Sequence, residues 1–206
     1  MDIALRGLFA TPVAAIEVPN AEERNVRLGQ VILARRDQFP SIQSSNAGGW
    51  HLERDLPAWG GEDARSILAL AQSAATRLTA GLDGRPVRPQ WVMQAWANVN
   101  GPGDGNICHY HPGSFWSGTY YVADGGCAAD PSLGGASEML DPHGPGPAMY
   151  APTLKFAGED GQSVGSAETI PPRAGLLVLF LSWLYHQVRP YRGSALRISI
   201  AFNLGV

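Results

Sequence analysis

Three histidines have the types and the spacing of a metal site. His109 and His111 are separated by a single residue, and His186 follows much later in the chain. Side chains two positions apart on an extended strand project to the same side, so His109 and His111 can lean toward one ion. Imidazole is a good ligand for divalent iron, zinc and copper. A third imidazole from a distant strand would complete one face of such a metal site.

An arginine and a serine that follow the histidines indicate a carboxylate-binding position. Arg197 and Ser199 lie on the same side of a segment patterned like the wall of a barrel. The planar fork of guanidinium donors fits a carboxylate, and a hydroxyl could add one more donor. A buried arginine without a partner would cost several kcal/mol, about as much as a broken buried ion pair. Its partner is therefore either an internal Asp or Glu or the carboxylate of a ligand, for which 2-oxoglutarate is well suited. Metal ligands next to such an arginine suggest an oxygenase with a keto-acid cosubstrate.

Four other polar residues are weaker candidates. Asn98, Asn106, Thr119 and Tyr121 are expected to face inward near the histidines and could bind the other end of the keto acid. Each could equally be a structural hydrogen-bonding residue. His51 and His143 lie in segments that read as loops, and we interpret both as solvated or locally hydrogen-bonded.

The pattern of the chain places these residues in a mainly β fold with flanking helices. Apolar periodicity predicts a helix from Asn20, as its N-cap, to about Asp37, and another over 62–80 that ends at Gly81. The segment 41–59 reads as a loop. Short strands separated by Gly and Pro follow. The clearest are 91–99, 107–111, 115–122, 176–181 and 196–204, with a shorter one at 137–140 and a hairpin over 150–175.

In the last of these strands, polar or small residues alternate with apolar ones. Arg197, Ser199, Ala201 and Asn203 would face a cavity, while Ile198, Ile200 and Phe202 would face the core. This alternation is typical of a strand in a ligand-holding barrel or sandwich.

Composition describes one globular domain. The chain has 206 residues, of which 45% are hydrophobic and 16% charged. We expect a single domain over 1–206, in which 1–85 is a helical support region and 86–206 is the β core. The net charge of −3 gives no reason to expect nucleic-acid binding, and no apolar run is long enough for a membrane helix. Two cysteines and no signal peptide favour a cytoplasmic location. An exposed N-terminal strand or helix could support a homodimer.

Several motifs together resemble a known family. They are Ala95-Trp-Ala-Asn-Val, His109-Tyr-His-Pro-Gly-Ser, Ser117-Gly-Thr-Tyr-Tyr-Val, Asp141-Pro-His, His186-Gln-Val and Arg197-Ile-Ser-Ile-Ala-Phe-Asn. Over roughly residues 90 to 206 the chain is similar to the 2-oxoglutarate- and Fe(II)-dependent oxygenases, in a branch with an H-x-H-P element that is distantly related to prolyl hydroxylases.

The resemblance implies a double-stranded β-helix, which is a cupin-like jelly roll. It implies Fe(II) at His109, His111 and His186, and 2-oxoglutarate at Arg197 and Ser199. The implied reaction is hydroxylation of a small molecule or a protein side chain, with release of succinate and carbon dioxide.

One residue departs from the pattern of the wider superfamily, which has H-x-D where this chain has His109-Tyr-His111. Either three histidines hold the metal, or only two do, or Glu138 or Asp141 supplies a carboxylate from a neighbouring strand. Two other functions also stay open at this point. One is a cupin-type metalloenzyme without a keto acid, and the other is a non-catalytic metabolite-binding β-sandwich.

Overall fold

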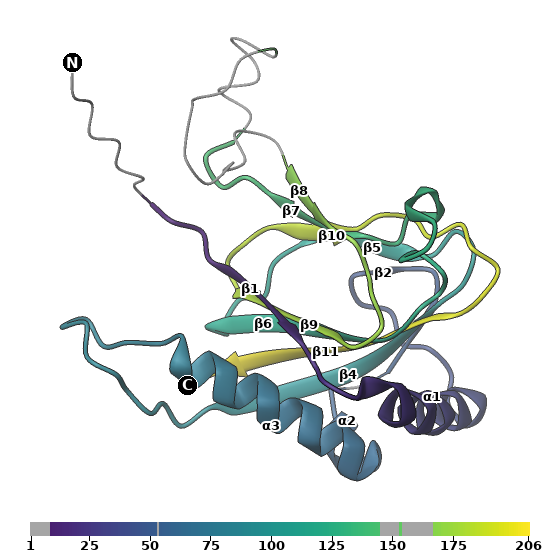
Figure 1. The fold of residues 1–206 in the computed structure, drawn as a ribbon, viewed down its shortest axis with the longest axis horizontal. Helices are drawn as coiled ribbons and strands as arrows, with labels where there is room; N and C mark the ends of the chain where they lie inside the picture. Colours follow the sequence, from purple (N-terminus) through teal and green to yellow (C-terminus); the bar gives the residue numbers. More distant parts are fainter. Residues whose placement is uncertain (1–8, 53, 145–152, 154–166) are drawn as a thin grey trace.

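Two antiparallel sheets face each other in the computed structural model, which describes residues 9–52, 54–144, 153 and 167–206 (Figure 1). The larger sheet has the strand order β1-β9-β6-β11-β4-β3 and the smaller one has the order β2-β5-β10-β7-β8. The larger sheet is formed by β1 Val13–Glu17, β9 Leu176–Leu181, β6 Trp116–Asp124, β11 Arg197–Gly205, β4 Val92–Asn100 and β3 Trp50–His51. The smaller sheet is formed by β2 Asn46–Ala47, β5 Gly105–His109, β10 His186–Val188, β7 Ser137–Leu140 and β8 Ala167–Ile170.

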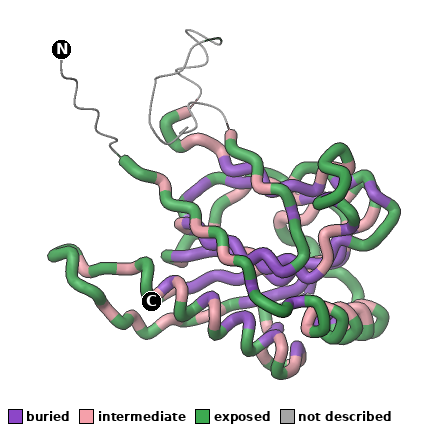
Figure 2. Tube along the Cα trace, viewed as in Figure 1, coloured by how far each residue is buried: buried purple, intermediate pink, exposed green. Residues whose placement is uncertain are grey.

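The helices cover the outer face of the larger sheet (Figure 1). They are α1 Ala21–Gln38, α2 Leu56–Trp59 and α3 Gly61–Arg77, and a short 3₁₀ turn, η1 Pro131–Leu133, lies in a connection. Leu28 and Ile32 of α1 and Ile67 of α3 are fully or almost fully buried against this sheet, while the outer sides of both helices are exposed (Figure 2). The predicted mainly β architecture with flanking helices is therefore confirmed.

The ends of the predicted helices need correction. Asn20 precedes α1 in the left-handed region, and its side chain makes no capping hydrogen bond, although Asn is a common N-cap residue. The second long helix ends at Arg77 and not at Gly81. Val26 is 60% exposed, because the buried face of α1 is set by Leu28 and Ile32.

The alternation predicted for the last strand is confirmed by β11. Ile198, Ile200, Phe202 and Leu204 are buried in the core that the helices cover. Arg197, Ser199 and Ala201 face the space between the two sheets, where they line a cavity. β11 lies between β4 and β6, so its inward row is flanked by the inward rows of both neighbours.

The segment 41–59 is not a simple loop. It contains β2, β3 and α2, and β3 pairs with β4 so that His51 lies opposite Asn98. His51 is only 3% exposed, which contradicts its interpretation as a solvated loop residue. A strand of two residues is too short to show periodicity, so its pairing could not be read from the sequence. Of the hairpin predicted over 150–175, residues 150–152 and 154–166 lie outside the described residues, and β8 follows them.

Candidate active site

The fold brings His109, His111 and His186 together between the sheets. One possible ligand nitrogen from each ring lies within 4.8 Å of the other two. His109 ends β5 and His186 begins β10, and the two are direct partners in the pairing of these strands. His111 lies just beyond β5, where its backbone N–H donates to the carbonyl of Ser182 at 2.9 Å. Three separate backbone constraints thus aim the rings at one point.

Two of the rings are held in the tautomer that a metal needs. The Nδ1 of His109 lies 2.7 Å from the carbonyl oxygen of Ile107, and the Nδ1 of His186 lies 2.8 Å from that of Leu184. A carbonyl oxygen only accepts hydrogen bonds, so each Nδ1 carries the proton and donates. The Nε2 lone pair of each ring is then free for a metal ion, an arrangement common to metal-binding histidines.

Burial keeps the three imidazoles neutral. Burial, with smaller contributions from His186, His109 and Arg54, lowers the pKa of His111 to about 3. Burial also lowers the pKa of His186 to about 4, and that of His109 below its ordinary value. Only a neutral imidazole can ligate a metal, so the site is in its ligating form at neutral pH.

Neither carboxylate considered from the sequence takes part in this cluster. Glu138 accepts hydrogen bonds from Arg189 and Gln187, and its neighbour Met139 faces the cavity instead. Asp141 accepts from His143 at 2.9 Å near the surface. Within the described residues, the histidine trio is the one group found with metal-site spacing.

Arg197 lies in the same cavity as the histidines and has no carboxylate partner among the described residues. Its residue is 2% exposed, and its Nε is buried without a hydrogen-bond partner. One terminal nitrogen donates to the Asn100 side-chain oxygen at 3.1 Å, and the guanidinium carbon lies 5.2 Å from the centre of the Tyr121 ring. No ion pair among the described residues includes Arg197, so the internal salt bridge considered above is absent from this part of the chain. A buried arginine that lines a cavity and has no acidic partner in the described part of the chain fits the carboxylate of a ligand.

The other predicted binding residues divide into two groups. Ser199, Asn106, Thr119 and Asn98 line the cavity. Tyr121 is fully buried and does not line it. The Tyr121 hydroxyl bonds the Ser137 hydroxyl at 2.8 Å, and its ring packs on Arg197, so it supports the arginine.

Three residues near the histidines were missed from the sequence. Trp96 lines the cavity with its ring centre 6.0 Å from that of His111, and Arg54 lies 5.3 Å from the Trp96 ring centre. The ring centre of His51 lies 5.7 Å from that of the same indole, and its Nδ1 lies 2.9 Å from the Asn98 side-chain oxygen. The pairing of β3 with β4 places His51 beside Asn98 and Trp96, and no pattern in the sequence predicts the register of that pairing.

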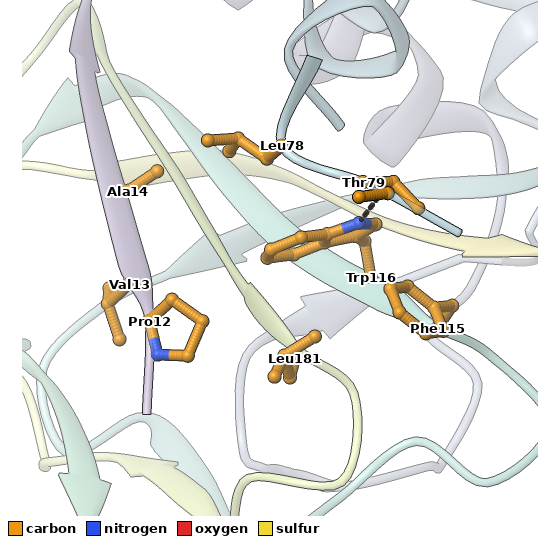
Figure 3. Close-up of a pocket in the computed structure, with 9 residues that line it drawn as sticks. Pro12, Val13, Ala14, Leu78, Thr79, Phe115, Trp116 and Leu181 are labelled. Carbon is orange, nitrogen blue, oxygen red and sulfur yellow. Dashed lines mark hydrogen bonds between the residues drawn. The ribbon is translucent and has the colours of Figure 1, made fainter. Parts of the chain in front are cut away.

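A second, larger cavity lies outside the barrel and carries little chemistry. It is lined by Pro12, Val13 and Ala14 of the first strand region, by the end of α3, and by Trp116 (Figure 3). The indole N–H of Trp116 donates to the Thr79 hydroxyl at 2.9 Å, which uses the main polar groups of this cavity (Figure 3). None of its lining residues is titratable at neutral pH, so the chemistry belongs to the histidine cavity.

Solved structures that are similar in fold include two prolyl hydroxylases and a protein with nickel and 2-oxoglutarate bound. A prolyl hydroxylase from Trichoplax adhaerens, in complex with a peptide fragment of the hypoxia-inducible-factor oxygen degradation domain, is 16% identical with a TM-score of 0.65, covering 94% of this chain and 83% of that one. A prolyl-4-hydroxylase from Pseudomonas putida is 18% identical with a TM-score of 0.61, covering 95% and 92%. HygX from Streptomyces hygroscopicus, with nickel and 2-oxoglutarate bound, is 12% identical with a TM-score of 0.57, covering 95% and 83%.

These similarities establish the double-stranded β-helix that was predicted. No curated protein matches the chain significantly. A family model described as "Putative 2OG-Fe(II) oxygenase" matches residues 94–203, which is more than half of the chain and includes the three histidines and Arg197. The protein is an enzyme whose cofactors are Fe(II) and 2-oxoglutarate, and the chain belongs to the 2OG-Fe(II) oxygenase family.

Proposed function

We propose that this oxygenase hydroxylates a C–H bond of its substrate and releases succinate and carbon dioxide. The observation that carries the proposal is the buried Arg197, which lines the same cavity as the three histidines and whose Nε finds no hydrogen-bond partner in the described part of the chain. An arginine in this state needs an anion, and a dicarboxylate that also reaches the histidine cluster would satisfy both ends of the cavity.

In this proposal His109, His111 and His186 hold Fe(II) through one nitrogen each, and Arg197 and Ser199 hold the far carboxylate of 2-oxoglutarate. Asn106 and Thr119 line the remaining wall, where they can donate to cosubstrate oxygens. When bound, Fe(II) would activate O₂, which is the oxidant. Oxidation of 2-oxoglutarate to succinate and carbon dioxide would supply two electrons and the substrate C–H bond the other two, so that one atom of O₂ enters succinate and the other the substrate hydroxyl.

The protein's own contribution is positioning and the exclusion of water. The Nδ1 hydrogen bonds of His109 and His186 fix ring orientation, and the stacking of Tyr121 on Arg197 fixes the guanidinium. Val178, Phe180 and Met139 form an apolar cluster against the site, which limits the access of water to the reacting centre.

The substrate class can be narrowed by analogy. The solved structures of this fold include a prolyl hydroxylase bound to a peptide fragment and HygX bound to hygromycin B. A peptide side chain or a small molecule is therefore the substrate that we propose for this protein. We also infer that 1–206 is one oxygenase domain, with 1–85 as support and 86–206 as the core. A cytoplasmic location without nucleic-acid partners, and a homodimer, remain part of the same proposal. None of the described helices is long and apolar enough to span a bilayer.

The test is a comparison of wild type with Arg197→Ala, in anaerobic titrations of the Fe(II)-loaded protein with 2-oxoglutarate. Losing a buried, charge-assisted bond should weaken 2-oxoglutarate about 30-fold or more, while metal uptake stays the same. Arg65→Ala, an exposed arginine on α3, is the matched control. Succinate formation in air would be measured on the same samples. Unchanged 2-oxoglutarate affinity in Arg197→Ala would reject this assignment and favour a metalloenzyme without a keto acid.

A further inference from the structure

The cavity around the histidines has an excess of positive charge. None of the described residues that line it is Asp or Glu, and a histidine that ligates a metal is neutral. Fe(II) carries two positive charges and 2-oxoglutarate two negative ones, so the loaded centre would be neutral by itself. Arg197 adds a positive charge at one end of the cavity. With metal and cosubstrate bound, the cavity would therefore keep one net positive charge. A substrate anion could bind there if a second cation lies near the cavity to pair with it.

Arg54 is a cation beside one wall of this cavity. Its guanidinium carbon lies 5.3 Å from the centre of the Trp96 ring, and that ring lines the cavity 6.0 Å from His111. No ion pair among the described residues includes Arg54, and its residue is exposed.

The hydrogen bond of Arg54 leaves its binding edge open. One terminal nitrogen, Nη1, donates to the side-chain oxygen of Gln94 at 2.8 Å. This bond and the Trp96 face hold the guanidinium in place, and its Nε and Nη2 have no partner among the described residues. The Nε–Nη2 edge is one of the faces through which arginine binds a carboxylate with two parallel hydrogen bonds.

The two arginines are hydrogen-bonded to opposite ends of the inward-facing row of β4. Gln94, Trp96, Asn98 and Asn100 alternate along one side of this strand, at about 3.3 Å per residue. Asn100 holds Arg197 at one end of the row, and Gln94 holds Arg54 at the other. Gln94 and Asn100 are thus separated along the strand by roughly 20 Å. Trp96 lies between them in the row, and its ring centre is 6.0 Å from that of His111.

We propose that Arg54 determines specificity by binding a carboxylate of the substrate, so that the enzyme acts on carboxylic acids. The substrate carboxylate pairs with the open edge of Arg54, its apolar body lies on the Trp96 ring, and the reacting carbon lies near His111. This inference rests on the proposed function, because it assigns the other end of the cavity to 2-oxoglutarate.

The probes that test it are a panel of aliphatic and aromatic N-acetyl amino acids, each paired with its primary amide. Binding is measured by calorimetry to protein loaded with redox-inert Zn(II) and 2-oxoglutarate. The better-bound acids should bind about 10-fold or more tightly than their amides, because only the acid offers a charged, two-oxygen acceptor. The Fe(II) protein should form succinate faster with those acids than with the amides.

Variants of Arg54 decide the source of this preference. Arg54→Gln should remove the difference between acid and amide, and Arg54→Lys should keep part of it, since lysine retains the charge without the fork. Arg65→Gln is the control and should retain the full preference. Equal binding of acids and amides by the wild type, or a preference that survives in Arg54→Gln, would overturn the proposal. Stronger competition by inorganic phosphate than by acetate would also overturn it, in favour of a phosphate-bearing substrate.

The two proposals fail differently. If 2-oxoglutarate does not bind the wild-type metal-loaded protein, or binds Arg197→Ala equally well, the proposed function is wrong. If 2-oxoglutarate binds through Arg197 but no acid is preferred to its amide, the assignment of Arg54 alone is wrong.

Discussion

At the residue scale, the three histidines act as one unit because a different backbone contact holds each of them. His109 and His186 are tied to carbonyl oxygens through Nδ1, while His111 is tied only through its backbone N–H. The pKa of His111 is lowered to about 3, chiefly by burial. Such a ring stays neutral and accessible to a metal, although no hydrogen bond from its side chain fixes its orientation.

His111→Ala should lower the affinity for Fe(II) or Co(II) at least 100-fold, because it removes one of three protein ligands. Metal titration with a competing chelator would measure the change. His143→Ala is the matched control, since His143 is exposed and pairs with Asp141 away from the cavity. An affinity close to that of the wild type in His111→Ala would show that two histidines suffice and that His111 has another role.

At the scale of elements, the strands of the larger sheet pack closely where β6 pairs with β11, beside the site. Gly118 lies in this pairing, opposite Phe202, and it also lines the cavity. A Cβ at this position would overlap the Val178 carbonyl and the Phe202 ring. The close approach of three strands at this point therefore depends on glycine.

Gly118→Ala should destabilise the protein by roughly 1 to 3 kcal/mol, the usual cost of overpacking a core. Gly29→Ala makes a useful contrast, because Gly29 lies in α1 with an open position for a methyl group. Alanine there should stabilise the helix by roughly 0.5 to 1 kcal/mol. Chemical denaturation of both variants would show whether the free energy of unfolding falls in Gly118→Ala and rises in Gly29→Ala. A neutral Gly118→Ala would mean that the strands can separate without cost.

The pairing of β7 with β10 should depend on pH through Glu138. Hydrogen bonds from Arg189 and Gln187 hold the pKa of this carboxyl below its ordinary value. A depressed pKa gives stability above the unfolded-state pKa of about 4.3, and this stability is lost as the pH falls through the folded-state value. The difference in unfolding free energy between wild type and Glu138→Gln should therefore be largest near neutral pH and should narrow below about pH 4.3. A difference that stays constant with pH would contradict this account.

At the scale of the whole molecule, metal and cosubstrate should stabilise the fold because they bind between its two sheets. The three histidines come from segments that are brought together only by folding, so the unfolded chain has no such site. At a ligand concentration 100 times its Kd, binding contributes about 2.7 kcal/mol. For a chain of this size that corresponds to a rise in Tm of roughly 5 to 10 °C.

Thermal unfolding would measure a rise in Tm on adding Zn(II), and the further addition of 2-oxoglutarate should give a second rise in Tm. Arg197→Ala should keep the rise in Tm with Zn(II) and lose most of the rise with 2-oxoglutarate. His111→Ala should reduce the rise in Tm with Zn(II). A rise of equal size in all three proteins would indicate metal binding elsewhere on the molecule.

Much of this arrangement could be predicted because strong local patterns specify it. The alternation in β11 showed that Arg197 and Ser199 face a cavity, and the spacing of His109 and His111 placed both rings on one side. The weaker predictions concerned segments without such a pattern. β3 has two residues, and the end of α3 is set by packing and not by Gly81.

The sequence by itself therefore determined the residue types of the site and the faces on which they lie, since side-chain direction in a strand follows from its period of two. Only the tertiary structure decided which of these residues meet. It placed Glu138 against Arg189 and away from the histidines, buried Tyr121 behind Arg197, and brought His51 and Arg54 to the Trp96 ring. The reason is physical. Pairings between strands distant in the chain depend on register and on the packing of the two sheets, and no local stretch of sequence contains that information.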